Sequence, residues 1–445
     1  MPAVAIVAEK FSSAWRTSIS AWGQPLLSSV TIPHVVAGQR HDFIQGMVEQ
    51  QIDGILQGLL EPVKEPALIE KAETASETLT IAGDDLMSTL DAVNNLFLEK
   101  GWGDGFPVIP PTPAAVERML KGTSRKPQDV VSIMEPGFGI ASVEKLAINA
   151  VIAGCQPEHL PVLIAAVEAL AEPQCILREM QVSTVPEAPL LLINGPIAKR
   201  LRINSGTTAM GPGAINYANT VIGRSLRLSL MNIGDCYAGE ADINTMGLPT
   251  KYSMCIAENE EASPWSPYHV ELGYKAQEST VTVVAVSGVA SIVDVSSTEP
   301  ETILDVAASA LQFTGSAPVG DWLRGGKINP AINKKVLAQH TLLIAPDHAR
   351  IMAQAGWSKA DVKNYLHRTA RMPLKRLFRG RGLKRDSLGN WFDRPDLQWM
   401  EEYPDMEVPI AASPDSFVVA VAGGPGNVSE FFWGIYGSAT KAIEE

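Results

Sequence analysis

The sequence predicts a layered, multi-domain α/β protein, and three observations lead to this fold class. Apolar, β-branched runs alternate along the chain with segments of helical periodicity, a pattern typical of sheets covered by helices. The length of 445 residues allows two or three domains, each with its own buried core. The hydrophobic content of 46% and the charged content of 19% are typical of a globular chain and exclude a disordered one.

The first domain is predicted over residues 1–62 as a truncated βαβα unit. The segments AVAIVAEKF and SSVTIPH have the apolar character of strands, and SSAWRTSISAW between them is helical. A second helix is indicated by apolar residues at helical spacing, namely Phe43, Met47, Ile52, Ile55 and Leu59. The polar sequence that follows predicts a linker over residues 63–95, part of it helical.

The second domain is predicted over residues 96–295 as the domain that carries a glycine-rich loop. It begins with the loop GWGDGFPVIPPT, in which Thr112 and Pro113 are the residue types of a helix N-cap and first helical position. Two apolar helices are predicted at residues 142–154 and 157–171, followed by the strand PLLLINGP. The segment ESTVTVVAVSGVASIVDV ends the domain as a strand.

The third domain is predicted over residues 296–445. It contains the helix PETILDVAASALQ, the strand HTLLIAPDH, the helix SKADVKNYLHRTAR and a last strand, SFVVAVAGGPG. Residues 363–385 hold nine Lys or Arg, a quarter of the chain's total of 36. This basic segment predicts a contact with another subunit or domain in preference to nucleic acid.

An internal repeat relates the last two domains. Residues 191–198 (LLINGPIA) resemble residues 342–349 (LLIAPDHA), and FVVAVAGGPG is a third apolar strand that ends in a Gly/Pro turn. We therefore expect a duplicated half-domain. Because ligands bind where strand ends meet their loops, the three turns are expected to line one crevice, with Gly424 contacting substrate. The alternative is that glycine and proline simply end unrelated strands.

Charge and cysteine content narrow the class of function. The net charge of −13 argues against general nucleic-acid binding, which needs an excess of Lys and Arg. The N-terminus lacks the features of a secretory signal and no run approaches 18 apolar residues, so we expect a cytoplasmic protein without a membrane partner. The cysteines form no CxxC motif and are too scattered for a disulfide framework: Cys155, Cys175, Cys236 and Cys255.

The glycine-rich stretch INSGTTAMGPGAINYANTVIGR, residues 203–224, is the first candidate site. Its glycines precede a helix predicted to start near Ala214, and a helix N-terminus with accessible N–H groups favours an anion. The spacing matches neither the Walker motif nor GxGxxG, so the anion is undefined. The alternative is a connecting loop whose glycines allow close packing. The predicted substrate-binding residues here are Asn204, Ser205, Gly206, Thr207, Gly211 and Gly213, with Thr208 as a further donor.

Arg224 and Asp104 extend this candidate site. Arg224 falls within the predicted helix among apolar neighbours, where an unpaired charge is costly, so we expect a carboxylate partner or a ligand. Asp104 lies between Gly103 and Gly105, and such a loop carboxylate can close over a substrate. Capping of its own turn is the alternative.

The segment KYSMCIAENEEASPWSPYH contains the candidate acid–base residues. Carboxylates beside a histidine supply proton-transfer groups or metal ligands, and the spacing fits no established metal motif. We therefore assign no metal ligand, and a solvated turn is the alternative. The candidate catalytic residues here are Glu258, Glu261 and His269, with Lys251 and Tyr252 as proton donors.

Two further residues have a catalytic and a structural interpretation. His348, in APDHA, is an acid–base candidate at a strand end, and a structural role at the helix entry is its alternative. Cys255, between Met254 and Ile256, is expected to be a buried apolar residue rather than a nucleophile.

Several strings together resemble the UGSC-domain proteins, a bacterial family. They are WGDGFPVIPPT, VEKLAINAVIAGCQPEHLPVLIAAVEA, PLLLINGP, INSG, GPG, IGR, KYSMCIAENEEASPW, GWSKADV and VAGGPG, between Ala3 and Trp433. The family is named for a selenocysteine- or cysteine-Gly-Ser-Cys motif in a small α/β domain, on a strand ahead of the segment that resembles VAIVAEKF. This sequence contains no GSC. The resemblance therefore implies that a separate polypeptide supplies the motif, or that the reaction does not need it.

The leading functional prediction is an enzyme, or the large subunit of one, that acts on a small anionic organic substrate by carboxylate and histidine acid–base chemistry. The sequence leaves oxidoreductase and lyase chemistry open and identifies no cofactor, although the family's selenocysteine favours redox or sulfur chemistry. One alternative is a non-catalytic partner of a GSC-containing protein. Another is a metal-dependent hydrolase or lyase that uses Glu258, Glu261 and a histidine. The expected assembly is a homo-oligomer, or a hetero-oligomer with a small subunit.

Overall fold

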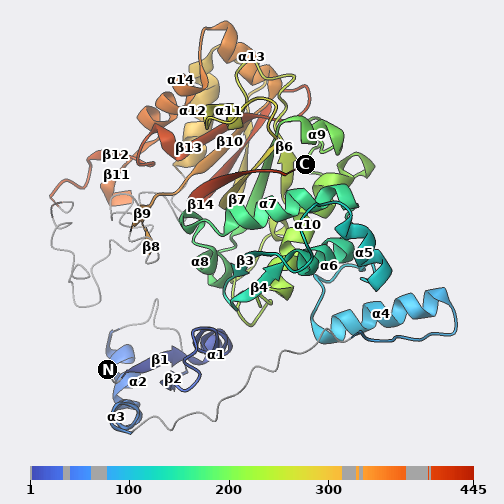
Figure 1. Cartoon of the computed structure of the whole chain (residues 1–445). Coiled ribbons are helices and arrows are strands. Elements are labelled where there is room, and N and C mark those ends of the chain that lie inside the picture. Colours follow the sequence, from blue (N-terminus) through green and yellow to red (C-terminus); the bar gives the residue numbers. More distant parts are fainter. Residues whose placement is uncertain are drawn as a thin grey trace.

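The central feature of the fold is a six-stranded mixed sheet (Figure 1). The computed structural model describes residues 3–33, 41–61, 78–312, 327–329, 334–376, 399 and 402–444. The strands of the sheet are β5 (Ala188–Asn194), β6 (Cys255–Ala257), β7 (Thr280–Val293), β10 (His340–Ile344), β13 (Phe417–Val421) and β14 (Val428–Ala442). Their order is β13–β10–β14–β7–β5–β6. Helices cover this sheet, so the predicted layered α/β class is confirmed.

The sheet consists of two three-stranded units with the same topology. In the first unit, β5 pairs in parallel with β6 and antiparallel with the long strand β7. In the second unit, β10 pairs in parallel with β13 and antiparallel with the long strand β14. The two long strands pair antiparallel and join the units at the centre. The repeat in the sequence thus corresponds to a repeat in topology.

Backbone hydrogen bonds align the two units at the carboxyl ends of their parallel strands. The first residue after β6, Glu258, donates its N–H to the carbonyl of Ile193 at 3.0 Å. The first residue after β13, Ala422, donates in the same way to Ile344 at 3.0 Å. Glu258 and Ala422 therefore occupy corresponding positions in the two units.

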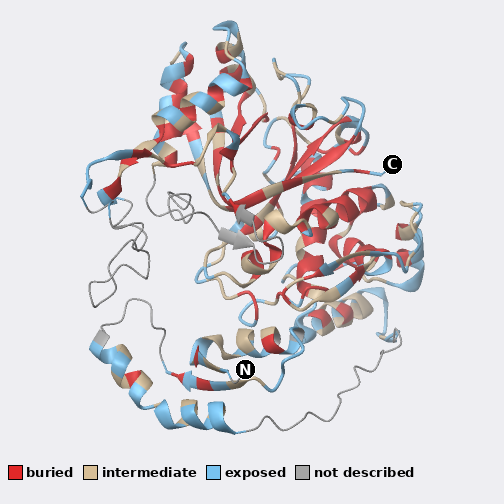
Figure 2. Ribbon diagram, turned by 60° about the vertical axis from the view of Figure 1, so that its left-hand side comes forward, coloured by how far each residue is buried: buried red, intermediate tan, exposed pale blue. Residues whose placement is uncertain are grey.

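The two faces of the sheet contribute to separate cores. One face of both units forms a shared cluster that includes Leu192, Val284, Leu343 and Phe432. On the other face, α7 (Leu160–Leu170) and α10 (Tyr217–Asn232) pack against the sheet, and the same core includes residues of α5 (Pro113–Leu120), α6 (Val143–Ala153) and α8 (Leu177–Val182). A second set packs against the second unit: α12 (Pro300–Leu311), α13 (Pro346–Gln354) and α14 (Lys359–Thr369). Figure 2 shows buried residues concentrated in the sheet and these helices.

The sheet curls until its two outer strands meet. β6 and β13 are the opposite edges of the sheet, yet Asn259 after β6 donates its backbone N–H to the carbonyl of Val421, the last residue of β13, at 2.7 Å. The Asn259 side chain also donates to the carbonyl of Gly423 at 3.2 Å. The carboxyl ends of the outer strands are therefore brought together, although their sequences are far apart.

The N-terminal residues form a small unit of their own with the predicted βαβα order. Strands β1 (Val4–Ala8) and β2 (Ser28–Ile32) pair in parallel, with helix α1 (Ser12–Ala21) between them. The predicted second helix is two helices, α2 (His41–Glu49) and α3 (Ile52–Leu60). The unit contacts the body where the Trp22 ring lies 5.1 Å from Phe138. Helix α4 (Leu86–Lys100) then occupies part of the predicted linker; residues 62–77 lie outside the described ranges.

The body differs from the sequence prediction in several elements. The strand at β13 is not the last one, because β14 follows it and lies at the centre of the sheet. The hairpin β3 (Val130–Met134) and β4 (Gly139–Ser142) and the short strand β6 were not predicted. The boundary predicted at residue 295 separates two halves of one sheet. The smaller elements are α9 (Pro196–Arg200), α11 (Tyr268–Glu271), β8 (Lys327–Asn329), β9 (Lys334–Val336), β11 (Arg371–Pro373) and β12 (Glu407–Pro409).

Two predictions on charge and membranes are covered in part by the described residues. Of the basic segment, residues 377–385 lie outside the described ranges, while Lys363 pairs with Glu271 and Lys375 with Asp405. Within the described ranges, no single helix is long and apolar enough to cross a membrane. One bent pair, Pro157–Leu170 with Pro173–Val182, passes the same criteria across a bend of 75°.

Candidate functional site

The loops that follow the parallel strands meet at one end of the sheet. The Gly423 N–H donates to the carbonyl of Ser205 at 2.8 Å, which joins the loop after β13 to the glycine-rich stretch. The Gly426 N–H donates to Asp347 Oδ2 at 2.8 Å, which joins it to the loop after β10. Two of the three turns expected to line one crevice, the GGPG and APDH turns, are therefore in contact, and the crevice itself stays a prediction.

Glu258, at the end of β6, lies at the centre of a buried polar network. Its side chain has no exposed surface. Oε2 accepts hydrogen bonds from Asn194 Nδ2 at 2.6 Å and from the Tyr268 N–H at 2.7 Å. Oε1 accepts from Lys359 Nζ at 3.2 Å. Because a buried carboxylate is costly unless paired and hydrogen-bonded, these donors are what allow Glu258 to be buried as an anion.

Lys359 and Lys363 neutralise the carboxylates on one side of this network. Lys359 is the first residue of α14, and its side chain is 5% exposed. Its Nζ lies 2.7 Å from Glu271 Oε1, in addition to its bond with Glu258. Lys363, one turn further along α14, pairs with Glu271 Oε2 at 3.0 Å. Two lysines thus face two glutamates, so the charges on this side balance.

Glu260 and His269 form the other side of the network. Glu260 Oε1 accepts from Asn194 Nδ2 at 3.0 Å and from the Gly195 N–H at 2.8 Å. The same oxygen lies 3.9 Å from His269 Nδ1, and the His269 side chain is fully buried. Neither ring nitrogen of His269 has a hydrogen-bond partner among the described residues, and neither has Asn194 Oδ1. Asn194 therefore bridges two carboxylates beside a histidine whose polar atoms are free.

The second unit of the sheet lacks this network. By their hydrogen bonding, Asn194 and Glu258 correspond to Ala345 and Ala422, the residues after Ile344 and Val421. Both alanines are buried, as are Asn194 and Glu258. The same strand ends therefore fold with small apolar residues, and the buried polar pair is a property of the first unit alone.

The glycine-rich stretch is held together by three asparagines. Asn204 accepts from the Gly206 N–H at 2.8 Å and donates to Asn216 at 2.7 Å. Asn216 donates to the carbonyls of Thr208 and Gly211. Asn219 Nδ2 donates to the carbonyls of Asn204, Ala209 and Cys255. These amides are occupied in fixing the loop, which favours the close-packing alternative over an anion site formed by their side chains.

The glycine positions of the site differ in why they favour glycine. A Cβ on Gly424 would lie 2.1 Å from Thr207 Oγ1, so this glycine allows two loops to touch. Gly213 has a φ of +144°, a conformation that favours glycine, and it immediately precedes the short 3-10 turn before α10. A Cβ on Gly206 or Gly211 would meet its nearest atom at 3.4 and 3.2 Å. Close packing therefore explains Gly424 rather than contact with a ligand.

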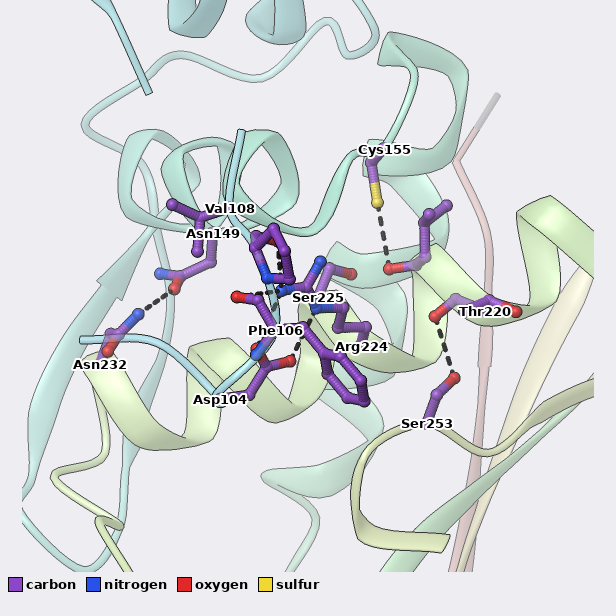
Figure 3. Close-up of polar contacts among 12 residues, drawn as sticks. Asp104, Phe106, Val108, Asn149, Cys155, Thr220, Arg224, Ser225, Asn232 and Ser253 are labelled. Atoms are coloured by element: carbon purple, nitrogen blue, oxygen red, sulfur yellow. Dashed lines mark hydrogen bonds and ion pairs between the residues drawn. The ribbon is translucent and has the colours of Figure 1, made fainter. Parts of the chain in front are cut away.

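Asp104 and Arg224 bind each other (Figure 3). Arg224 Nε and Nη2 donate to the two oxygens of Asp104 at 2.7 and 2.8 Å, and Nη2 also donates to the Pro107 carbonyl at 3.0 Å. The partner expected for Arg224 is thus a carboxylate of the chain. Tyr252 is exposed and packs edge-on against Phe106 beside this pair, 5.0 Å between ring centroids.

Lys251 belongs to a separate cluster and not to the network around Glu258. Its Nζ donates to Asp242 and Asn244, and Asp242 also pairs with Arg227. Burial, followed by the nearby Arg227 charge, lowers the pKa of Lys251. The cluster is internally paired, so it ties the loop after α10 to that helix.

Glu261 and His348 also lie apart from Glu258. Glu261 is exposed and pairs with Lys199 at 2.8 Å. Ser429 Oγ accepts from the Ala345 N–H, and it donates to His348 Nδ1 at 2.8 Å when the ring carries its proton on Nε2, the nitrogen that faces a carbonyl. His348 Nε2 then donates to the carbonyl of Asp294 at 2.9 Å. Both ring nitrogens are satisfied within the buried interior, which favours the structural role for His348.

Thiol and metal chemistry find little support in the described residues. All four cysteines are free and buried. Burial raises the pKa of Cys155 and Cys175 to about 12 and that of Cys236 to about 11, and raises the pKa of Cys255 as well. Across the described ranges, no three His, Cys, Asp or Glu side chains lie together as a metal-binding group. Glu258 and Glu261 do not converge with a histidine as the metal-dependent alternative requires.

Sequence reasoning missed three members of the network. The sequence pattern indicates only a strand end at Asn194, does not distinguish Glu260 from its neighbouring glutamates, and gives no signal at Glu271. Lys359 entered only through the GWSK string of the family resemblance. The available signal was a polar residue, Asn194, at the end of an otherwise apolar strand, a place where ligand contacts concentrate.

The chain was also compared with known proteins. No family model, no curated protein and no solved structure gives a significant match. The resemblance to the UGSC-domain proteins stays a prediction, and the site is interpreted from its own geometry.

Proposed function

We propose that the chain is an enzyme, or the large subunit of one, that binds a small anionic organic substrate at the carboxyl ends of β5 and β6. The observation that carries the proposal is the difference between the two units of the sheet. Asn194 and Glu258 stand where the second unit has Ala345 and Ala422, so the fold itself does not require a buried carboxylate there. A costly buried polar network that the second unit does without is the feature that we interpret as functional.

The residues of the network have different roles: Glu260 and His269 transfer protons, and Glu258 positions Asn194. Glu260 is 29% exposed and reaches solvent, whereas His269 beside it is fully buried. This pair is placed to move a proton between substrate and solvent, a step that oxidoreductases and lyases share. Glu258, fixed by Asn194 and Lys359, is a positioning residue that holds Asn194 in place. Arg202, which follows α9 and is exposed, supplies positive charge for the anionic group of the substrate.

The test is a double variant that gives the first unit the residues of the second. Asn194→Ala with Glu258→Ala is expected to fold, because Lys359 keeps Glu271 as its partner. Thermal unfolding is measured with a panel of small hydroxy-, oxo- and amino-carboxylates, beside native mass spectrometry for co-purifying molecules. Glu261→Gln, at an exposed carboxylate nearby, is the matched control.

We expect at least one carboxylate to raise the melting temperature of the wild type and of Glu261→Gln but not of the double variant. A wild type that responds to none of the panel and carries no bound molecule contradicts the proposal. So does a double variant that responds as the wild type does.

A second candidate function is a partner subunit of a GSC-containing protein. The observation that favours it is the two-stranded parallel sheet of the N-terminal unit, on which Ile6 of β1 is 48% exposed. Parallel strands are usually covered and extended by others, so this surface suits a further strand. Co-expression with a small GSC-containing α/β protein of the same genome tests it. A complex that Ile6→Lys disrupts supports this function, and separate elution of the two wild-type chains contradicts it.

A further inference from the structure

We propose that Glu260, His269 and Asn194 bind a primary ammonium group of the substrate. The inference rests on the proposed function and names its substrate class: a small molecule with an ammonium at its inner end and an anionic group at the rim. The argument uses the charge, the free acceptor atoms and the burial of these three side chains.

Charge is the first consideration, because no Lys or Arg of the described residues pairs with Glu260. Lys359 and Lys363 are occupied by Glu258 and Glu271 on the other side of the network. The Glu260 carboxylate accepts from two neutral donors through Oε1, and Oε2 accepts no hydrogen bond from the described residues. An unneutralised carboxylate that is 29% exposed favours a positively charged ligand.

The free polar atoms are the second, independent observation. His269 is fully buried, and its ring points Nδ1 toward Glu260 at 3.9 Å with no bond from either nitrogen to the described residues. Asn194 Oδ1 is likewise free, and so is Thr280 Oγ1, on the residue of β7 directly opposite Asn194. Each of these atoms can accept a hydrogen bond, given the neutral His269 tautomer with its proton on Nε2.

An ammonium group matches this set of atoms. It carries one positive charge and three N–H donors, and the neighbouring side chains of Glu260, Asn194 and His269 carry a carboxylate oxygen, an amide oxygen and an imidazole nitrogen, with the Thr280 hydroxyl on the paired strand. An anion at the same place would face Glu258 and Glu260, which are close enough to share one amide nitrogen. The anionic part of the substrate is therefore expected to bind at Arg202, the exposed cation after α9.

The test uses propylammonium chloride as the probe, with binding followed by saturation-transfer NMR on the full chain. Tetramethylammonium has the same charge without N–H donors, and propionate has the opposite charge. We expect propylammonium to bind better than either. Glu260→Gln is expected to weaken its binding about tenfold or more, the effect of removing a charge-assisted hydrogen bond. Glu261→Gln, one residue away and paired with exposed Lys199, is expected to leave it unchanged.

His269→Asn serves as the second variant, since it keeps a polar side chain and loses the imidazole. Weaker propylammonium binding in both His269→Asn and Glu260→Gln supports the inference. Equal binding of tetramethylammonium, or binding that Glu260→Gln leaves unchanged, overturns it. If a carboxylate without an amine still stabilises the wild type and not the Asn194→Ala, Glu258→Ala variant, the ammonium inference fails while the proposed function stands.

Discussion

Asp104 and Arg224 lie 120 residues apart and form a two-pronged ion pair at 2.7 and 2.8 Å. Their side chains are 4% and 14% exposed. The pair joins the GWGDG loop to the middle of α10, and Asp104 Oδ1 also accepts from the Phe106 N–H at 3.2 Å, which favours the turn-capping alternative for Asp104. The ion pair therefore holds the loop around Asp104 against α10.

Asp104→Asn is expected to lower the free energy of unfolding by about 3 kcal/mol, because it leaves a largely buried guanidinium without a carboxylate. Urea denaturation at constant pH measures the change. Asp405→Asn is the control, since Asp405 pairs with Lys375 on the surface and its loss is expected to cost less than about 0.5 kcal/mol. Equal losses in the two variants contradict this interpretation of the Asp104 pair.

Gly424→Ala is expected to destabilise the protein by about 2 kcal/mol, because the added Cβ overlaps Thr207 and forces two packed loops apart. Gly206→Ala is the matched control, since its Cβ would meet only Asn204 Oδ1, at 3.4 Å, in ordinary contact. The measurement is again the urea midpoint. A Gly424→Ala protein as stable as the wild type means that the two loops do not depend on this close contact.

Lys359→Met is expected to cost about 3 kcal/mol or more, because Glu258 is then a buried carboxylate without a cation. Adding Glu258→Gln removes that charge, so the double variant is expected to be less destabilised than the sum of the singles, with a coupling above about 1 kcal/mol. The exposed pair Lys199–Glu261 provides the control cycle, with a coupling expected near zero. Additive losses for Lys359 and Glu258 would show that the two charges are independent.

Acid is expected to destabilise the protein through His340. Burial lowers the pKa of His340 to about 4, and its Nδ1 accepts a hydrogen bond from the Gly434 N–H, which needs the neutral ring. The unfolded chain takes up this proton near pH 6.5 and the native protein does not, so stability falls as the pH drops from 6.5 to 4, by up to about 3 kcal/mol.

His340→Asn keeps an acceptor for Gly434 and cannot ionise, so it is expected to flatten the dependence of unfolding free energy on pH over this range. Some slope is expected to remain, because burial also lowers the pKa of His159. Urea titrations at a series of pH values from 7 to 4 measure it. An unchanged slope in His340→Asn rules out this histidine as the acid-sensitive group.

The sequence predicts elements well where periodicity is local and poorly where distant contacts decide. Helices α6 and α7 follow from apolar residues at helical spacing, and β5 from an unbroken apolar run. The central strand β14 has no regular apolar pattern to predict it, and its pairing with β7 shifts register around Gly434. That glycine is required by the carbonyl of Gln339, which a Cβ would overlap. No pattern within the strand reveals such a contact.

The candidate site shows the same division. Glu258 and His269 are identifiable from residue type, because carboxylates and histidine stand close in sequence. Their partners Asn194 and Lys359 come from distant segments of the chain: the pairing of β5 with β6 brings Asn194 to Glu258, and the start of α14 brings Lys359. In the glycine-rich stretch the sequence predicts a ligand site where the structure has asparagines bonded within the loop. Polar side chains that stabilise a loop are of the same types as those that bind a ligand.

The pairing of β7 with β14 joins two units of the same topology into one sheet, so the second unit shows what the first would look like without a polar site. The same strand pairing forms with the buried alanines Ala345 and Ala422 in one unit and with the polar residues Asn194 and Glu258 in the other. The two units of one chain therefore provide their own comparison. Exchange of residues between the copies, rather than comparison with other proteins, is then the direct way to ask which changes created a site.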